Sequence, residues 1–318
     1  MKKRVIALLS GGISSEREVS LNSGNQVFDA LDKEKYTIRR YDPKTDLPRL
    51  VAEAGDIDFA LIILHGPFGE DGTVQGMLDL LGIPYQGAGV LGSAVAMNKL
   101  TSKRLYEKAG IPTPAYMVAT ADRPVTAELV AKTIGFPVVV KPAQCGSSIG
   151  LSIVRDADAL AEALKTGFRH DHTLLVEDCI EGTELTGGVI GNAGLKALPL
   201  IEIVPGEGYA FFDYNAKYLP GATTEICPAR VSEDVTARAQ TLAVKAHEAL
   251  FLRGYSRTDM MLRGEDLFVL ETNTIPGMTR TSLFPQAAAV AGMSFSQMLD
   301  RLIELGLEDE RSAHRQPR

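Results

Sequence analysis

Strand and helix patterns alternate through the first hundred residues of the chain. In order, as strand, helix, strand, helix, strand and helix, they cover residues 4–9, 18–31, 36–41, 47–54, 59–64 and 74–81. Such alternation is typical of a parallel sheet flanked by helices. Ligands of such sheets bind at the loops that follow the strands, here residues 10–16 and 65–72. The sequence therefore predicts an N-terminal α/β domain with its site at these loops.

A second strong pattern lies near the carboxyl end. An apolar run over residues 267–270 is followed by Glu271 and Asn273, just before a Pro-Gly turn. Residues i and i+2 of a strand share one face, so these oxygen ligands lie side by side. Asp259 sits on the preceding strand-like run, and a hairpin would bring all three together. Such a set suits Mg²⁺, which usually shares its shell with substrate phosphates.

Between these regions, a glycine- and serine-rich loop at residues 144–150 joins two strand-like runs directly after Lys141. Free backbone N–H groups and a lysine favour phosphate binding over a plain hairpin turn. The loop also matches the G-x-S-x-G elbow of hydrolases, but that elbow needs a helix next, and a strand pattern follows. The G-x-G-x-x-G at residues 87–92 lacks a solid preceding strand, and no Walker A pattern occurs.

The N-terminal loops contribute further polar side chains. Ser15 and Glu18 fit a capping box for the first helix, which leaves Glu16 and Arg17 to face the cleft. A carboxylate there would suit a substrate ammonium group. His65 follows the third strand of a parallel sheet, a position that makes a role in the site about as probable as a structural one.

Two further segments bear on the site. Residues 211–218 hold four aromatic side chains and Lys217 within a polar loop, which indicates either an ordered loop core or a lid over phosphates. Arg257 shares a strand face with Asp259. It is expected either to stabilise developing negative charge or to form a salt bridge with Asp259 or Glu271. Residues 90–109 predict one long helix, ended by Gly110 and the prolines after it.

Composition excludes several classes of function. The net charge of −7 and the absence of a long basic run argue against nucleic-acid binding. No segment approaches the roughly 18 apolar residues of a membrane helix. The three cysteines form no metal or disulfide pattern and fit a reducing compartment. We expect a soluble, cytoplasmic protein.

Taken together, the motifs resemble those of the D-alanine–D-alanine ligases of the ATP-grasp superfamily. Seven segments carry the resemblance in the family's order: GGISSEREVSLNSG (11–24), LHGPFGEDGTVQGMLDLLGIPYQGAGVLGSA (64–94), VVVKPAQCGSSIG (138–150), FFDYNAKY (211–218), EICPA (225–229), RTDMM (257–261) and ETNTIPGMTRTSL (271–283). The resemblance implies an α/β fold with a parallel-sheet N-terminal domain (1–98), a central ATP-grasp subdomain (99–185) and a C-terminal one (186–318).

The resemblance also implies a reaction. ATP phosphorylates one D-alanine, the amine of a second attacks the acyl phosphate, and D-alanyl-D-alanine, ADP and phosphate are released for peptidoglycan synthesis. Two Mg²⁺ ions, replaceable by Mn²⁺, and a homodimer are typical of the family. This agrees with phosphoryl transfer, which needs positioning and charge neutralisation. Alternatives left open are a related ligase that uses D-serine or D-lactate as second substrate, a nucleotide-binding regulatory module and a hydrolase.

Roles follow from motif positions. ATP would be held by Lys99, Lys141, Glu177, Ile180, Glu184 and Lys217, and the metal ions by Asp259, Glu271 and Asn273. The catalytic groups would be Glu16, Ser147, Tyr218, Arg257 and the backbone N–H of Gly277. The D-alanine molecules would be bound by Glu16, His65, Ser282 and Leu283. The chain departs from the usual family pattern at Asn98, at Gln144 and Cys145, and at Asp178, positions that bear on nucleotide affinity.

Overall fold

The computed structural model describes residues 3–206 and 223–313, so the expected lid residues Lys217 and Tyr218 lie outside the described part. The helices are α1 (Arg17–Ala30), α2 (Leu47–Ala52), η1 (a 3₁₀ turn, Ala54–Asp56), α3 (Thr73–Leu81), α4 (Val90–Met97), α5 (Lys99–Lys108), α6 (Ala127–Thr133), α7 (Leu160–Gly167), α9 (Glu233–Ala249), α10 (Leu283–Val290) and α11 (Phe295–Ala313). The strands are β1 (Arg4–Leu9), β2 (Tyr36–Tyr41), β3 (Phe59–Ile62), β4 (Tyr116–Thr120), β5 (Val138–Pro142), β6 (Ser152–Val154), β7 (Thr173–Asp178), β8 (Thr183–Gly191), β9 (Lys196–Ala197), β10 (Ile201–Pro205), β11 (Thr223–Ile226), β12 (Gly254–Arg263) and β13 (Asp266–Asn273).

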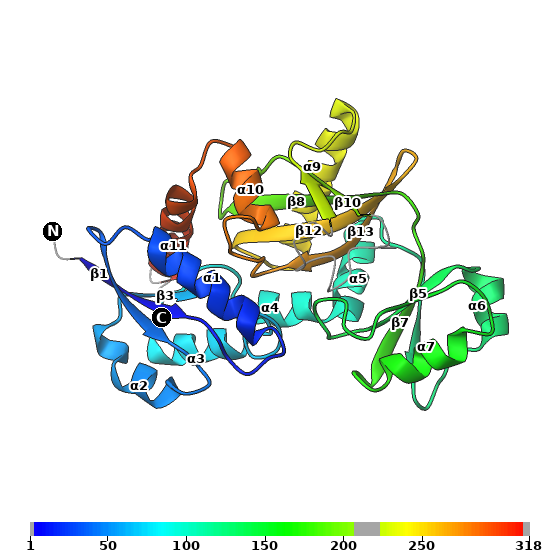
Figure 1. Cartoon of the computed structure of the whole chain (residues 1–318), viewed down its shortest axis with the longest axis horizontal. Coiled ribbons are helices and arrows are strands. Elements are labelled where there is room, and N and C mark those ends of the chain that lie inside the picture. The colour runs from blue at the N-terminus through cyan, green and yellow to red at the C-terminus, as the bar shows by residue number, and fades with distance from the viewer. Residues whose placement is uncertain (1–2, 207–222, 314–318) are drawn as a thin grey trace.

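The N-terminal sheet is parallel, as predicted, with strand order β2-β1-β3. Alternate residues of β1 enter different cores: Ile6 and Leu8 pack on one face, Ala7 and Leu9 on the other. Helices cover both faces, which explains why β3 and most of β1 are apolar, whereas the edge strand β2 carries Arg39 and Arg40. Helix α11, from the far end of the sequence, contributes Leu302 to the first of these cores, a placement that the sequence did not predict. Figure 1 shows α1 and α11 on one side of the sheet and α3 on the other.

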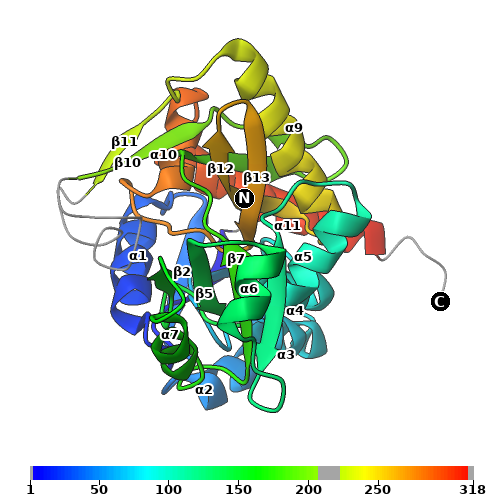
Figure 2. The same cartoon turned by 90° about the vertical axis from the view of Figure 1, so that its right-hand side faces the viewer.

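The other two sheets are built mainly of antiparallel strands. The central one has the order β4-β7-β5-β6 and packs against α6 and α7. The C-terminal one has the order β11-β10-β8-β12-β13, with β9 beside β8, and it is covered by the alanine-rich side of α9. Figure 2, turned by 90°, shows the central sheet in front of the N-terminal domain and the C-terminal sheet above both. The mixed α/β class is therefore confirmed.

One predicted helix is in fact two. Residues 90–109 break at Asn98, whose backbone is extended (φ −95°, ψ 100°) between α4 and α5. The Asn98 side chain accepts a hydrogen bond from the backbone N–H of Thr101 at 2.9 Å, and thus caps α5. The backbone N–H of Lys99 donates to the carbonyl of Ala143 at 2.8 Å. The capping residue therefore overrides the continuous helix pattern and fixes Lys99 beside the start of the glycine- and serine-rich loop at residues 144–150.

A second expectation about a helix start is also wrong. Helix α1 begins after Glu16 rather than after Ser15, and no side-chain cap bond forms there. The hydroxyl of Ser14 instead accepts from the backbone N–H of Glu16 at 3.2 Å and donates to the carbonyl of His65 at 2.7 Å. Among the residues that the structure describes, no helix is long and apolar enough to cross a bilayer.

Candidate active site

The expected hairpin of acidic residues forms. Strands β12 and β13 pair antiparallel, with Asp259 opposite Glu271 and Arg257 opposite Asn273. The register shifts directly after Asp259, which is the mark of a β-bulge and re-aims side chains at that point. Asp259 is only 7% exposed. The three predicted metal ligands are thus adjacent, and the amide nitrogen of Asn273 lies 3.1 Å from an oxygen of Asp259.

Both carboxylates of this hairpin are paired with cations. The guanidinium of Arg257 donates to Asp259 in a bidentate arrangement, from Nε at 2.8 Å and from an Nη at 2.7 Å. Lys99 Nζ lies 3.0 Å from an oxygen of Glu271. Asp259 and Glu271 were the two expected partners of Arg257, and this ion pair is with Asp259. Such charge-assisted pairs hold the carboxylates in place without consuming all of their acceptor capacity.

Polar side chains also support the hairpin from within. The hydroxyl of Thr186 donates to Asp259 at 2.7 Å. On the opposite face, Tyr106 of α5 donates to the hydroxyl of Thr272 at 2.8 Å, and Thr272 lies 3.0 Å from the hydroxyl of Thr258. Sequence reasoning missed this network. The only signal was spacing, because Tyr106 lies seven residues after Lys99, on the same helix face.

One cavity of about 560 Å³ lies between the central and C-terminal sheets. Its lining includes five residues predicted to bind ATP, Lys99, Lys141, Glu177, Ile180 and Glu184, together with Asp259 and Glu271. Burial is strong here, since Lys141 is 8% and Glu177 2% exposed. The structure therefore brings together every described residue assigned to ATP. Lys217 lies outside the described residues.

The loop after Lys141 closes one end of this cavity. Ser147 and Ser148 adopt left-handed backbone conformations (φ 49° and 57°), which are uncommon for residues other than glycine. Lys99 Nζ donates to the carbonyl of Cys145 at 2.8 Å. Strand β6 follows the loop and pairs with β5, so the strand–turn–helix geometry of a hydrolase elbow is not formed.

A second cavity, of about 480 Å³, lies between the N-terminal domain and the hairpin. Its lining includes all described residues assigned to D-alanine or to catalysis: Glu16, His65, Ser147, Arg257, Gly277, Ser282 and Leu283. It shares Lys99, Ser147 and Glu271 with the first cavity. These three residues therefore mark the junction at which a phosphoryl group would pass from one cavity to the other.

The N-terminal side of the second cavity is formed by an acidic cluster. The Ser147 hydroxyl donates to Glu16, which is 7% exposed, so this bond joins the phosphate loop to the N-terminal domain. Glu70, which sequence reasoning missed, also lines the cavity and accepts from the backbone N–H of Gly66 at 2.7 Å. Burial, together with the charge of Glu16, raises the pKa of Glu70 to about 8. The carboxyl group of Glu70 is thus protonated more readily than that of an ordinary glutamate.

His65 lies in the same cluster and is buried. Burial lowers the pKa of its imidazole, although the carboxylate of Glu16 acts in the opposite direction. Its Nε2 has no hydrogen-bond partner among the described residues. The histidine is therefore neutral near pH 7, with a polar atom available to a ligand.

The opposite side of this cavity is the start of α10. Ser282 is the residue before the helix, with extended backbone, and Leu283 is the first helical residue. The hydroxyl of Ser282 accepts from the backbone N–H of Thr279 at 3.1 Å. Helix N-termini present free N–H groups and favour anions, so this end suits a carboxylate.

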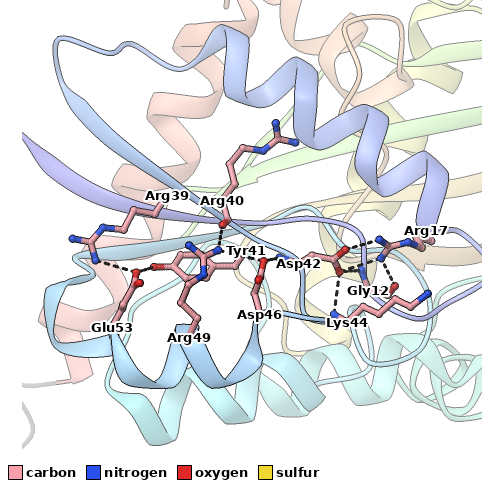
Figure 3. Close-up of polar contacts among 10 residues, drawn as sticks. All are labelled: Gly12, Arg17, Arg39, Arg40, Tyr41, Asp42, Lys44, Asp46, Arg49 and Glu53. Carbon is pink, nitrogen blue, oxygen red and sulfur yellow. Dashed lines mark hydrogen bonds and ion pairs between the residues drawn. The ribbon is translucent and has the colours of Figure 1, made fainter.

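Arg17 does not face the cleft as expected. Figure 3 shows its guanidinium turned to Asp42, with contacts of 3.0 and 2.6 Å, and to the carbonyl of Gly12 at 2.8 Å. Asp42 also accepts from the backbone N–H groups of Gly12 and Lys44. Burial alone would raise the pKa of Asp42, but these hydrogen bonds hold it below its ordinary value. Arg17 therefore braces the loop that presents Glu16.

Comparisons with known proteins show which family this chain belongs to. The family model described as the D-ala D-ala ligase C-terminus matches residues 105–304, and the model of the N-terminus matches residues 42–88. The chain belongs to the D-alanine–D-alanine ligase family. It is 65% identical to the D-alanine–D-alanine ligase of Syntrophobacter fumaroxidans, over 97% of this chain and 99% of the relative. The corresponding enzyme of Desulfotalea psychrophila is 54% identical over 95% of each chain.

Solved structures of family members share the fold. The D-alanine–D-alanine ligase of Bacillus anthracis complexed with ATP superposes with a TM-score of 0.86 and 36% identity, covering 98% of this chain and 99% of that one. The ligase of Coxiella burnetii gives a TM-score of 0.85 with 29% identity, covering 99% and 97%. The predicted family and its ATP-grasp architecture are thereby confirmed.

Proposed function

We propose that this chain joins two D-alanine molecules to D-alanyl-D-alanine, converts ATP to ADP and phosphate, and serves peptidoglycan synthesis. The observation that carries the proposal is the meeting of two cavities at Lys99, Ser147 and Glu271. One is lined by paired lysines, which suit a nucleotide, and the other by carboxylates and a helix N-terminus, which suit an amino acid. The family membership supports the same reaction.

In the nucleotide cavity, Lys99 and Lys141 would hold phosphates, while Glu177, Ile180 and Glu184 would surround the adenine and ribose. Lys99 lies between Glu271 and the carbonyl of Cys145, on the lining of both cavities, where a phosphate could replace these partners. The loop after Lys141 adds backbone N–H groups. Lys217, predicted to contact the transferring phosphate, remains a prediction.

The hairpin fits a magnesium site. Asp259, Glu271 and Asn273 offer hard oxygen donors from adjacent strand positions, and two carboxylates with one amide leave room for phosphate oxygens and water. Within the described ranges, no group of three or more His, Cys, Asp or Glu side chains is arranged for a metal. Two Mg²⁺ ions, or Mn²⁺, when bound, would neutralise phosphate charge. Arg257 and Lys99, which now pair with these carboxylates, would then be released toward substrate.

In the second cavity, Glu16 would hold the ammonium group of the first D-alanine and keep its carboxylate aimed at the γ-phosphate. Ser282 and the backbone of Leu283 would hold the carboxylate of the second D-alanine. Arg257 and the backbone N–H of Gly277 would stabilise the oxyanion that forms when the amine attacks. The attacking amine must lose a proton, and neutral His65 lies nearby to accept one.

The linking serine and the lid complete the proposal. Ser147 bonds Glu16 across the junction of the two cavities, and Tyr218 would extend this set to the lid. Closure of a lid would exclude water from the acyl phosphate. D-serine or D-lactate as second substrate remains the alternative, and the pair Lys217–Tyr218 favours an amine acceptor.

The domain boundaries, the oligomeric state and the location of the protein are also proposals. We infer domains at residues 1–98, 99–185 and 186–318, with α11 returning to the N-terminal sheet. A cytoplasmic homodimer fits the chain. Exposed apolar side chains on the adjoining helices α3 and α4 support an interface there: Leu80, Val90 and Leu91 are 91%, 43% and 59% exposed. Sedimentation velocity with Leu80→Glu tests this, since the variant is expected to be monomeric.

An assay of the purified protein tests the function. With ATP and Mg²⁺, phosphate release is expected only when D-alanine is present, with D-alanyl-D-alanine identified by mass spectrometry. D-serine and D-lactate, added in competition with D-alanine, report the choice of second substrate by product mass. Phosphate release that D-alanine does not change would contradict the ligase assignment.

A further inference from the structure

The nucleotide cavity is backed by a lysine that the proposed reaction does not use. Lys103 lies one turn after Lys99 on α5, and its side chain is fully buried. Its ammonium group donates to the hydroxyl of Thr113 at 2.6 Å and lies 3.3 Å from Glu177. The ring centroid of Tyr116 lies 5.3 Å away. A fully buried lysine is rare because removal of its charge from water is costly.

Glu177 is shared between two lysines. One of its oxygens lies 3.3 Å from Lys103 Nζ, and the other lies 2.9 Å from Lys141 Nζ. Of these three residues, Lys141 and Glu177 line the nucleotide cavity and Lys103 does not. With both lysines charged, the triad carries a net charge of +1. Without Lys103, the pair Lys141–Glu177 is neutral.

We propose that Lys103 is a positioning residue for the nucleotide phosphates: it neutralises Glu177 from behind, so that Lys141 presents its positive charge to ATP. The proposal rests on ATP as the ligand of this cavity. In this arrangement the carboxylate of Glu177 also acts on the phosphate end of the site, through Lys141. The contacts proposed for Ile180 and Glu184 with adenine and ribose would not depend on Lys103.

Protonation of Lys103 supports this arrangement. Burial lowers the pKa of Lys103 to about 8, against the opposing charge of Glu177. The groups that face it are Glu177 and Lys141 from the cavity side and, more weakly, Glu107 on its own helix, with the ring of Tyr116 on β4. Between pH 7 and 9 the triad thus loses its net charge, and the affinity for phosphate-bearing ligands should fall.

Calorimetric binding of ATP, ADP and adenosine tests the proposal. For Lys103→Met we expect the Kd of ATP to rise about tenfold, as loss of one screened charge implies, and that of ADP to rise less. The Kd of adenosine should stay within about twofold, because adenosine carries no charge. Lys165→Met is the matched control, since Lys165 is 64% exposed and forms an ion pair with Glu162 on the same helix.

Two results for Lys103→Met would overturn the proposal. Equal loss of ATP and adenosine binding would show that Lys103 merely supports the fold, and unchanged ATP binding would show that Glu177 needs no neutralisation. If Lys103→Met does not fold, the wild-type protein gives the answer: between pH 7 and 9 the Kd of ATP should rise while that of adenosine stays constant, and parallel curves would overturn the proposal. A wild-type protein that binds no ATP would contradict the proposed function instead.

Discussion

The two cavities differ in how their charges are compensated. In the nucleotide cavity each lysine is already paired, Lys99 with Glu271 and Lys141 with Glu177, at 3.0 and 2.9 Å. In the second cavity, Glu16 and Glu70 lie in one cluster beside His65, a neutral imidazole. Compensation there comes partly from protonation, because the pKa of Glu70 is raised to about 8.

This difference matches the ligands that the two cavities would take. ATP brings several negative charges, which can replace the carboxylates as partners of the lysines. Before ATP binds, the carboxylates therefore keep the lysines charged and in position. D-alanine brings an ammonium group and a carboxylate, and its second copy must also lose a proton. A cluster with shifted protonation suits that task. The variants below test this contrast, beginning with the largest expected effect.

Glu271→Gln should lower turnover by at least about a thousandfold, because it removes a metal ligand and the partner of Lys99 together. The thermal midpoint should change little, since Glu271 is partly exposed. Glu265→Gln, on the exposed turn of the same hairpin, is the matched control. Activity close to that of the wild type with full magnesium dependence would remove Glu271 from the metal site.

Ser147→Ala should lower kcat/KM for D-alanine by about ten- to a hundredfold, because it breaks the link from the phosphate loop to Glu16. The Kd of ATP, measured without D-alanine, should stay within about twofold. Equal losses for both substrates would mean that the two cavities are not separable at this residue, which would weaken the contrast drawn above.

Tyr106→Phe should lower the free energy of unfolding by about 1 kcal/mol, since it removes the buried hydrogen bond to Thr272 on β13. The magnesium concentration for half-maximal activity should rise a few-fold, because Thr272 lies between Glu271 and Asn273. Tyr116→Phe is the control for the loss of a tyrosine hydroxyl, because the hydroxyl of Tyr116 donates to Glu107 at the surface. A stability loss without any change in magnesium dependence would confine Tyr106 to folding.

For Glu70→Gln the expected effect is on how stability depends on pH rather than on turnover. The folded protein raises the pKa of Glu70 to about 8 from an ordinary 4.5, so the folded state holds a proton that the unfolded chain releases. This contribution is complete below about pH 4.5 and is lost as pH rises to about 8. The variant should therefore gain stability relative to the wild type across that window, measured by thermal unfolding. A constant difference would contradict the raised pKa.

Much of this site could be predicted from local pattern. The run around Glu271 and Asn273 has strand periodicity and a turn signal. A hairpin with the strand of Asp259 was assumed on that basis, and the structure forms it. The parallel order of the first strands followed from alternation with helices. Motif positions supplied candidate site residues, and the described ones each line one or both of the two cavities, while their roles stay predictions.

The parts that were missed depend on tertiary contacts. Lys103 reads as a surface lysine in a charged helix, but tertiary contacts with Thr113, Tyr116 and Glu177 bury its side chain. Arg17 follows Glu16 in sequence, yet its partner Asp42 comes from the loop after another strand. Asn98 lies within a continuous helix pattern in the sequence. Its hydrogen bond to the start of α5 forms only because its backbone is extended, which the pattern does not show. No periodicity in the sequence encodes these partners.

Transfer of an oxygen label tests the central claim, that one phosphoryl group passes from the nucleotide cavity to a carboxylate in the other. D-alanine labelled with ¹⁸O in its carboxylate is incubated with the protein, ATP and Mg²⁺, and the released phosphate is examined by mass spectrometry. If an acyl phosphate forms at the junction near Lys99, Ser147 and Glu271, each released phosphate carries one ¹⁸O from D-alanine. Unlabelled phosphate released together with dipeptide would contradict the account.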